Sequence, residues 1–190
     1  MALPYGFKAK ANRIALNYRA RLGKDPEDPL DVRALSDLLK IPIIPLSSFV
    51  KSHPRQVQHL TRVDRDAFSA VLIPTSAKLR IIIVNDCHSP GRQNSSVAHE
   101  LSHVILGHPP SYSFGRSALQ NYDQGIEGEA NILASHLLIT NEAALRIVRM
   151  NFSSTAACQI YGVSNGMLQY RLNASGARKR MARAGFQRAR

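Results

Sequence analysis

The segment that decides the fold runs from Ser95 to Gly107 and reads SSVAHELSHVILG. At about 100° per residue its apolar side chains fall on one face of a helix, while His99 and His103 share the other face. The apolar set is Val97, Leu101, Val104 and Ile105. Ser95 or Ser96 is expected to cap the start of this helix, and Gly107, which two prolines follow, to end it.

The two histidines enclose a glutamate in the spacing His-Glu-x-x-His. Side chains four residues apart on a helix point the same way, so His99 and His103 can share one zinc ion. Glu100 can then reach a zinc-bound water and act as a general base. The plainer interpretation is an amphipathic helix with two surface histidines and a solvated glutamate, which leaves the joint spacing unexplained.

A catalytic zinc site needs a third protein ligand and an open position for water. Residues 121–139 supply Glu127 and Glu129, followed by apolar residues at helical spacing. Glu129 lies beside that apolar face and can reach inward to a metal, or it is simply a first-turn glutamate favoured by the helix dipole. Glu127 is expected to point elsewhere and to cap the helix or be solvated. His136 either donates a hydrogen bond near the metal or lines the cleft, and the second role is favoured.

These residues resemble the ImmA/IrrE family of metallo-endopeptidases. The matching pieces are Ile83-Val84-Asn85, Arg92, Ala98 to His103, Glu129-Ala130-Asn131 and Leu137-Leu138. The resemblance implies a zincin-like α+β fold, with N-terminal helices, a small antiparallel or mixed sheet, a zinc helix and a second helix that supplies a glutamate. It also implies that Glu129, rather than Glu127, is the third zinc ligand.

Three departures from the family pattern bear on substrate contacts more than on the chemistry. Ser102 stands where the family usually has glycine, and Asn94-Ser95-Ser96 replaces a more apolar approach to the zinc helix. Ile139-Thr140 stands where Met-Pro is common.

Composition favours a cytoplasmic protein of one catalytic domain with a small appendage. The chain has 190 residues, no apolar run long enough to span a membrane, and no signal-peptide pattern at its start. Its two cysteines, Cys87 and Cys158, suit reduced thiols. The formal net charge is +12, and residues 143–190 carry nine basic and no acidic side chains. Such a tail predicts attraction to nucleic acid or to an acidic protein.

Elsewhere the pattern predicts two N-terminal helices and a small sheet. The first helix spans residues 8–22, and Asp28 is expected to cap the second. Residues 41–46 contain two prolines and should form an edge strand. Residues 67–73 and 79–84 read as a hairpin. In similar zinc peptidases an edge strand beside the cleft pairs with the extended substrate.

Residues 108–125 are expected to form a loop that walls or covers the cleft. Tyr112, Tyr122 or His108 could donate a hydrogen bond to the oxyanion of the reaction, and the sequence does not choose among them. Ordinary packing is the plainer role of each.

The predicted domains are a peptidase domain over residues 1–150 and a basic segment over 151–190. Residues 157–172 have the spacing of a helix-turn-helix, which can contact DNA or serve as a plain two-helix appendage. The arginines from Arg178 to Arg190 are expected to form a disordered basic arm.

The expected function is zinc-dependent hydrolysis of a peptide bond, with His99, His103 and Glu129 as ligands and Glu100 as the base. Mn²⁺ or Fe²⁺ also suits such ligands. Kinship implies a protein substrate, a helix-turn-helix transcriptional repressor of a mobile element or stress regulon. The alternative is a DNA- or protein-binding regulator that uses the peptidase fold as a scaffold, and a general protease is a third option.

Overall fold

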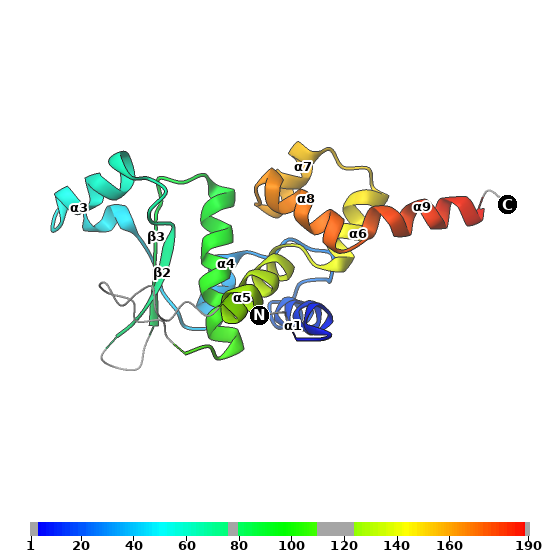
Figure 1. The fold of residues 1–190 in the computed structure, drawn as a ribbon, viewed down its shortest axis with the longest axis horizontal. Coiled ribbons are helices and arrows are strands. Elements are labelled where there is room, and N and C mark those ends of the chain that lie inside the picture. Colours follow the sequence, from blue (N-terminus) through cyan, green and yellow to red (C-terminus); the bar gives the residue numbers. More distant parts are fainter. Residues whose placement is uncertain (1–3, 76–79, 110–123, 189–190) are drawn as a thin grey trace.

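A computed structural model describes residues 4–75, 80–109 and 124–188 of the chain. These residues form an α+β fold in which helices pack on a small sheet (Figure 1). The N-terminal half contains α1 (Phe7–Arg21), α2 (Val32–Leu38), β1 (Ile43–Pro45), the 3₁₀ helix η1 (Leu46–Phe49), α3 (Pro54–Gln58), the π-helix η2 (His59–Val63), β2 (Ala70–Pro74) and β3 (Arg80–Val84). The remainder contains α4 (Pro90–Leu106), α5 (Gln124–Leu138), α6 (Asn141–Arg149), α7 (Ser154–Tyr161), α8 (Asn165–Ala174) and α9 (Ala177–Arg188).

The sheet has the strand order β1-β3-β2. β3 pairs in parallel with β1, where Ile82 faces Ile43, and antiparallel with β2, where Ile82 faces Leu72. The predicted hairpin and the edge position of the proline-containing strand are therefore confirmed. β2 forms the other edge, and it lies beside α4 (Figure 1).

The hydrophobic core lies between the sheet and the helices, with α4 at its centre. Ile82 of β3, Leu101 of α4 and Leu133 of α5 are fully buried in one apolar cluster. α5 packs against both α4 and α1. The same cluster includes Tyr161 of α7 and Leu168 of α8, so apolar side chains on both sides of residue 150 share one core.

Two predicted helix starts are wrong. α4 begins at Pro90 after Ser89, because proline suits the first helical position, where no N–H is needed. Ser95 and Ser96 therefore lie inside the helix, and their hydroxyls donate to the carbonyls of Gly91 and Arg92. α2 is capped by Asp31, which accepts from the Arg33 N–H, rather than by Asp28.

The predicted end of the zinc helix is confirmed. Gly107 follows Leu106 with a φ of 71°, in the left-handed region that favours glycine.

Two buried arginines bind the C-terminal carbonyls of α5. Arg19 of α1 donates to the carbonyls of Leu137 and Leu138, and Arg171 of α8 donates to the carbonyl of Ile139. Both guanidinium groups satisfy acceptors at the negative end of the helix dipole. The position of α5 is therefore fixed from the N-terminal and the C-terminal helices at once.

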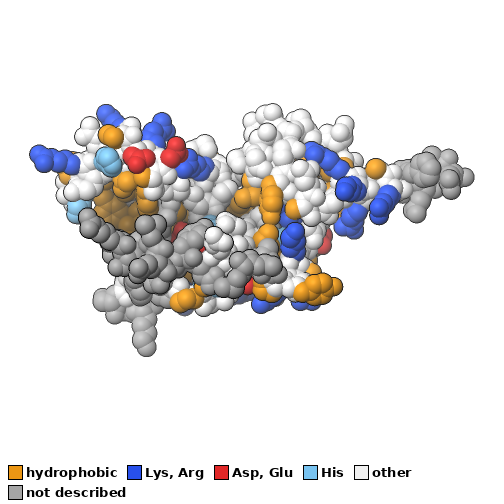
Figure 2. Space-filling model, viewed as in Figure 1, with side chains coloured by type: hydrophobic (Ala, Val, Ile, Leu, Met, Phe, Trp, Pro, Cys, Tyr) orange, Lys and Arg blue, Asp and Glu red, His pale blue; other side chains and the backbone are white. Residues whose placement is uncertain are grey.

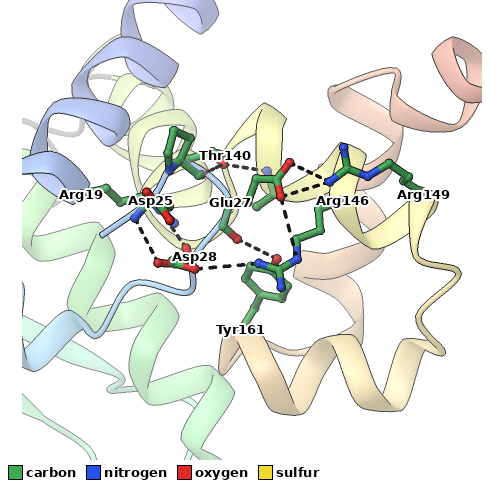
Figure 3. Close-up of polar contacts among 10 residues, drawn as sticks. Arg19, Asp25, Glu27, Asp28, Thr140, Arg146, Arg149 and Tyr161 are labelled. Carbon is green, nitrogen blue, oxygen red and sulfur yellow. Dashed lines mark hydrogen bonds and ion pairs between the residues drawn. The ribbon is translucent and has the colours of Figure 1, made fainter. Parts of the chain in front are cut away.

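The C-terminal helices dock on the N-terminal region through a second set of polar contacts (Figure 3). Arg149 of α6 donates to both carboxylate oxygens of Glu27, at 3.1 and 3.2 Å. Arg146 approaches Glu27 and Asp28 at 3.9 and 3.8 Å. The Tyr161 hydroxyl donates to the Glu27 carbonyl. Arg146 and Arg149, two of the basic side chains of the C-terminal segment, are therefore paired with acidic side chains within the molecule.

The turn between α7 and α8 sits on the first turns of α4. Ser164 caps α8 by accepting from the Met167 N–H, and Gly162 has a φ of 60°. Asn94 of α4 donates to the Gly162 carbonyl, and a Cβ added at Gly91 would lie only 2.7 Å from the Val163 carbonyl carbon. The two-helix unit expected from the sequence is thus present, with its turn buried against the zinc helix.

The basic arm after Arg178 was expected to be disordered, but α9 continues to Arg188. The helix extends away from the body of the molecule (Figure 1). No helix among the described residues has the length and apolar character needed to cross a membrane.

Candidate metal centre

His99 and His103 lie one turn apart on α4 and present their Nε2 atoms to each other at 3.0 Å. Their rings meet nearly edge to face, with an angle of 78° between the planes. The helix buries its apolar face through Val97 and Leu101, which leaves both imidazoles on the side that faces α5. The expected pairing of the two histidines is present.

Glu127 of α5 completes a group of three ligand atoms. Its carboxylate oxygens lie 3.1 Å from Nε2 of His99 and 3.5 Å from Nε2 of His103. A tetrahedral zinc ion with bonds of about 2.0–2.1 Å holds its ligand atoms about 3.3 Å apart. The two imidazole nitrogens and the nearer Glu127 oxygen of each pair have separations close to that spacing, and one ligand atom from each residue lies within 4.8 Å of the others, so these residues fit a zinc ion.

Glu129 is the predicted third ligand, but in the structure the carboxylate that lies against the two histidines is that of Glu127. Among the described residues the group able to hold a metal is His99, His103 and Glu127. α5 begins at Gln124, so Glu127 lies within the helix rather than before it. Residues two apart on a helix diverge by about 200°, and Glu129 therefore points to another neighbour, His108, at 3.4 Å.

The second nitrogen of each imidazole also has a partner. Nδ1 of His99 lies 3.0 Å from the Asn131 amide oxygen, to which it donates, and this leaves Nε2 as an acceptor for metal. Nδ1 of His103 lies 3.0 Å from Nδ1 of His108. Asn131 follows Glu127 by four residues on α5, so one face of this helix supplies both a ligand and the group that orients another ligand.

Glu100 lies in the cleft between α4 and the edge strand. One of its carboxylate oxygens accepts from the Leu72 N–H of β2 at 3.1 Å. Burial, together with the negative charge of Glu127, raises the pKa of Glu100 to about 7, which suits a group that must accept and return a proton near neutral pH. Burial lowers the pKa of His103 to about 4, so its imidazole is neutral and able to bind a metal at pH 7.

The remaining predicted residues have different placements. Tyr112 and Tyr122 lie outside the described residues. His108 contacts both His103 and Glu129, close to the ligand group. His136 is buried in α5, where its Nδ1 donates to the Ile132 carbonyl, and it is not among the three ligand residues. This placement therefore does not favour the expected role of His136 in lining the cleft.

The match to a family model covers residues 43–173, more than half of the chain, and the family is the peptidase M78 family, described as an IrrE N-terminal-like domain. The chain belongs to this family. The expected ImmA/IrrE kinship and zincin-like α+β fold are thereby confirmed. A comparison with curated proteins gives no match. Membership in the peptidase M78 family assigns the chain to a class of metallopeptidases, and the ligand group lies within the matched range.

Proposed function

We propose that this protein is a zinc-dependent endopeptidase. The observation that carries the proposal is the convergence of His99, His103 and Glu127 on one point, with ligand atoms within 4.8 Å of one another. When bound there, zinc would lower the pKa of a water molecule and polarise the carbonyl of the bond to be cut. Mixed nitrogen and oxygen ligands also accept Mn²⁺ or Fe²⁺.

Glu100 is the proposed proton carrier. Its carboxylate lies next to the ligand group, and its raised pKa supports uptake of a proton from the attacking water and its delivery to the leaving amine. The Leu72 N–H holds this carboxylate at the edge of β2. A pure scaffold would have no chemical need for a buried carboxylate at this position.

A protein segment in extended conformation is the proposed substrate, and the edge strand supports this. Among the described residues β2 pairs with β3 on one side only, and its other side faces α4, where the Leu72 N–H is already bound by Glu100 and the backbone groups of Ala70 also point outward. An extended peptide can add to such an edge. From the family kinship we propose a helix-turn-helix transcriptional repressor that acts in the cytoplasm with this enzyme.

Paired variants test the proposal on a candidate repressor encoded beside this protein. Glu100→Gln should retain one zinc per chain and lose cleavage by at least about 100-fold, because the proton carrier is gone. His103→Ala should lose both zinc and cleavage. Repressor fragments that form equally with wild type and Glu100→Gln would contradict the proposed chemistry, whereas tight binding without any cleavage would favour the scaffold.

We also propose that the C-terminal segment contacts nucleic acid, through α9 rather than α8. Lys and Arg side chains lie along α9 (Figure 2), and the exposed ones are Arg178, Lys179, Arg180 and Arg183. Of these, Arg178 donates to Asn173 and Gln169. By contrast, Arg146, Arg149 and Arg171 are occupied by contacts within the molecule. The exposed residues of α8 carry no charge, and binding to phosphates depends on free cations.

A charge-matched pair of variants tests this second function. Replacing Lys179, Arg180 and Arg183 with Gln should weaken binding to duplex DNA and lower the slope of log affinity against log salt by about 2–3. Replacing the exposed Lys8, Arg13 and Arg33 with Gln changes the net charge equally but should leave the slope unchanged. Equal effects of both triple variants would contradict a role for α9.

A further inference from the structure

His108 follows the glycine that ends α4, and the turn there folds it back onto the metal centre. Gly107 has a φ of 71°, and the His108 N–H donates to the His103 carbonyl at 3.0 Å. A bond that spans five residues beside a left-handed glycine is typical of the turn that closes many helices. Five residues of continued helix would instead turn the His108 side chain about 140° away from that of His103. The turn therefore brings the two side chains together.

Both ring nitrogens of His108 have partners at the metal centre. Nδ1 lies 3.0 Å from Nδ1 of His103, and Nε2 lies 3.4 Å from a carboxylate oxygen of Glu129. The two imidazole rings meet at 66°, with 5.1 Å between their centroids, so they approach edge to face. The His108 side chain is only 8% exposed. A buried ring with a partner on each nitrogen has little freedom to rotate.

The contact between the two Nδ1 atoms requires one hydrogen, because two acceptors would repel each other. His103 presents Nε2 to Nε2 of His99 and to the Glu127 carboxylate, where a metal would bind. A neutral imidazole that binds metal through Nε2 carries its hydrogen on Nδ1. Nδ1 of His103 is therefore the donor of this contact, and Nδ1 of His108 is the acceptor.

The same reasoning places the hydrogen of His108. A neutral ring that accepts at Nδ1 carries its hydrogen on Nε2, and Nε2 faces the Glu129 carboxylate, which accepts when it is ionised. The two hydrogen bonds then run in one direction, from His103 to His108 and on to Glu129. His99 differs, because its Nδ1 reaches an acceptor directly, the amide oxygen of Asn131.

We infer that His108 and Glu129 are positioning residues, which hold His103 in the orientation and tautomer that bind zinc through the hydrogen-bonded relay His103–His108–Glu129. The inference rests on the proposed metal site and deepens the proposed peptidase function. A zinc-bound histidine commonly donates its other N–H to a carboxylate directly, whereas here a second histidine stands between the two. Glu129 is then the anionic end of the relay instead of a metal ligand.

Zinc affinity, measured on the full-length protein by competition with a chromogenic chelator, tests the role of His108. His108→Phe keeps a ring of similar size but offers no acceptor to the His103 N–H, and it should bind zinc about 10- to 100-fold more weakly than wild type. His108→Asn restores an acceptor, since its amide oxygen is bonded to Cγ as the lost Nδ1 is, and it should recover at least about 5-fold of this loss. The matched control is His59→Phe, at an exposed histidine of η2, and its affinity should change by less than about 2-fold.

Nitrogen NMR of the imidazole rings tests the direction of the relay, which simple packing of His108 would not define. In the zinc-loaded wild type, His103 should carry hydrogen on Nδ1 and His108 on Nε2. The metal-free protein at about pH 8, where an ordinary imidazole is neutral, should keep His108 in the same form. Glu129→Leu should remove this preference in the metal-free protein, whereas Glu129→Gln should retain it, because the amide oxygen also accepts.

Three results would overturn the inference. They are wild-type zinc affinity in His108→Phe, equal affinities in His108→Phe and His108→Asn, and a hydrogen on Nδ1 of His108 in the zinc-loaded protein. If the wild-type protein binds no zinc, the metal site fails and the relay with it. Stoichiometric zinc binding without cleavage of any repressor contradicts the peptidase function alone, and the affinities and tautomers then still decide the relay.

Discussion

At the scale of single residues, the metal centre depends on the angular position of side chains along α5. Glu127 and Asn131 are four residues apart and face α4 together, where one approaches the ligand nitrogens and the other orients His99. Glu129 lies between them in sequence and faces His108 instead. A shift of two residues along this helix thus separates a carboxylate beside both histidine Nε2 atoms from one that contacts His108.

Substitution of the two glutamates distinguishes their roles. Glu127→Gln should weaken zinc binding by at least about 100-fold, since it replaces an anionic ligand by a neutral amide. Glu129→Gln is the matched control, and its affinity should change by less than about 10-fold. Competition with a chromogenic chelator measures both. If only the Glu129→Gln variant loses zinc, the third ligand is Glu129, as the family resemblance implies, and not Glu127.

The buried histidine of α5 makes stability depend on pH. Burial, with the nearby positive charge of Arg171, lowers the pKa of His136 to about 4. As the pH falls below about 6.5, the unfolded chain binds a proton that folded His136 still excludes, so the free energy of unfolding decreases until about pH 4. His136→Leu should reduce this decrease by about 2–3 kcal/mol.

Urea unfolding of the metal-free protein between pH 7 and pH 4.5 measures this effect, because zinc release then makes no contribution. The same decrease in wild type and His136→Leu would contradict the assignment.

The sequence predicts His99, Glu100 and His103 directly, because a fixed spacing within one helix carries the information. It does not predict the third ligand in the same way. The choice between Glu127 and Glu129 depends on which face of α5 meets α4, and this is set by the packing of α5 against α4 and α1 rather than by spacing within α5. The spacing of Glu127 and Asn131 was the available signal.

At the scale of elements, α4 is held between the sheet and the turn that joins α7 to α8. Gly91 permits this contact, because a Cβ there would lie 2.7 Å from the Val163 carbonyl carbon and 2.8 Å from the Ser164 nitrogen. Both are backbone atoms, which cannot rotate away as a side chain can. The start of the zinc helix is therefore positioned by the C-terminal segment.

Gly91→Ala should lower the free energy of unfolding by about 1–3 kcal/mol, because the turn must move away from α4. Gly166→Ala in α8 is the matched control. Its new methyl group would have only the Ser164 hydroxyl nearby, at 3.9 Å, and the change should be neutral or stabilising by up to about 1 kcal/mol. Denaturant unfolding compares the two, and equal destabilisation would contradict the close contact.

Element types were predictable where periodicity is strong, as for the first helix, the hairpin and the zinc helix. The boundaries of these elements were less predictable than their types. The sequence offers Ser95 and Ser96 as caps, yet Ser89-Pro90 starts the helix and the two serines lie one to two turns inside it. The long α9 was missed because its charge density resembles that of disordered segments.

At the scale of the whole molecule, the positive charge of residues 143–190 has two roles. Arg146 and Arg149 bind acidic residues of the α1–α2 connection, and Arg171 is buried at the end of α5. Among the side chains of this segment that the structure describes, the remaining exposed cations lie on α9. A count of charges along the sequence cannot separate these groups, since the separation depends on which parts of the chain meet in three dimensions.

The division at residue 150 remains a prediction, and removal of residues 151–190 tests it. The truncated chain would lose Tyr161 and Leu168 from the shared core and Arg171 from the carbonyls of α5. We expect it to lack a cooperative thermal transition, whereas the full chain should unfold in one transition. Circular dichroism reports both. A truncated chain that folds and binds zinc with full-length affinity would support two independent domains.

The central claim is tested most directly by adding zinc to the metal-free full-length protein while cleavage of the candidate repressor is followed. We expect the cleavage rate to rise in proportion to added zinc, to reach its maximum at one zinc ion per chain, and to stay at background in Glu100→Gln over the whole titration. Cleavage by the metal-free protein at the same rate, or no cleavage at one zinc per chain, would contradict a zinc-dependent peptidase function.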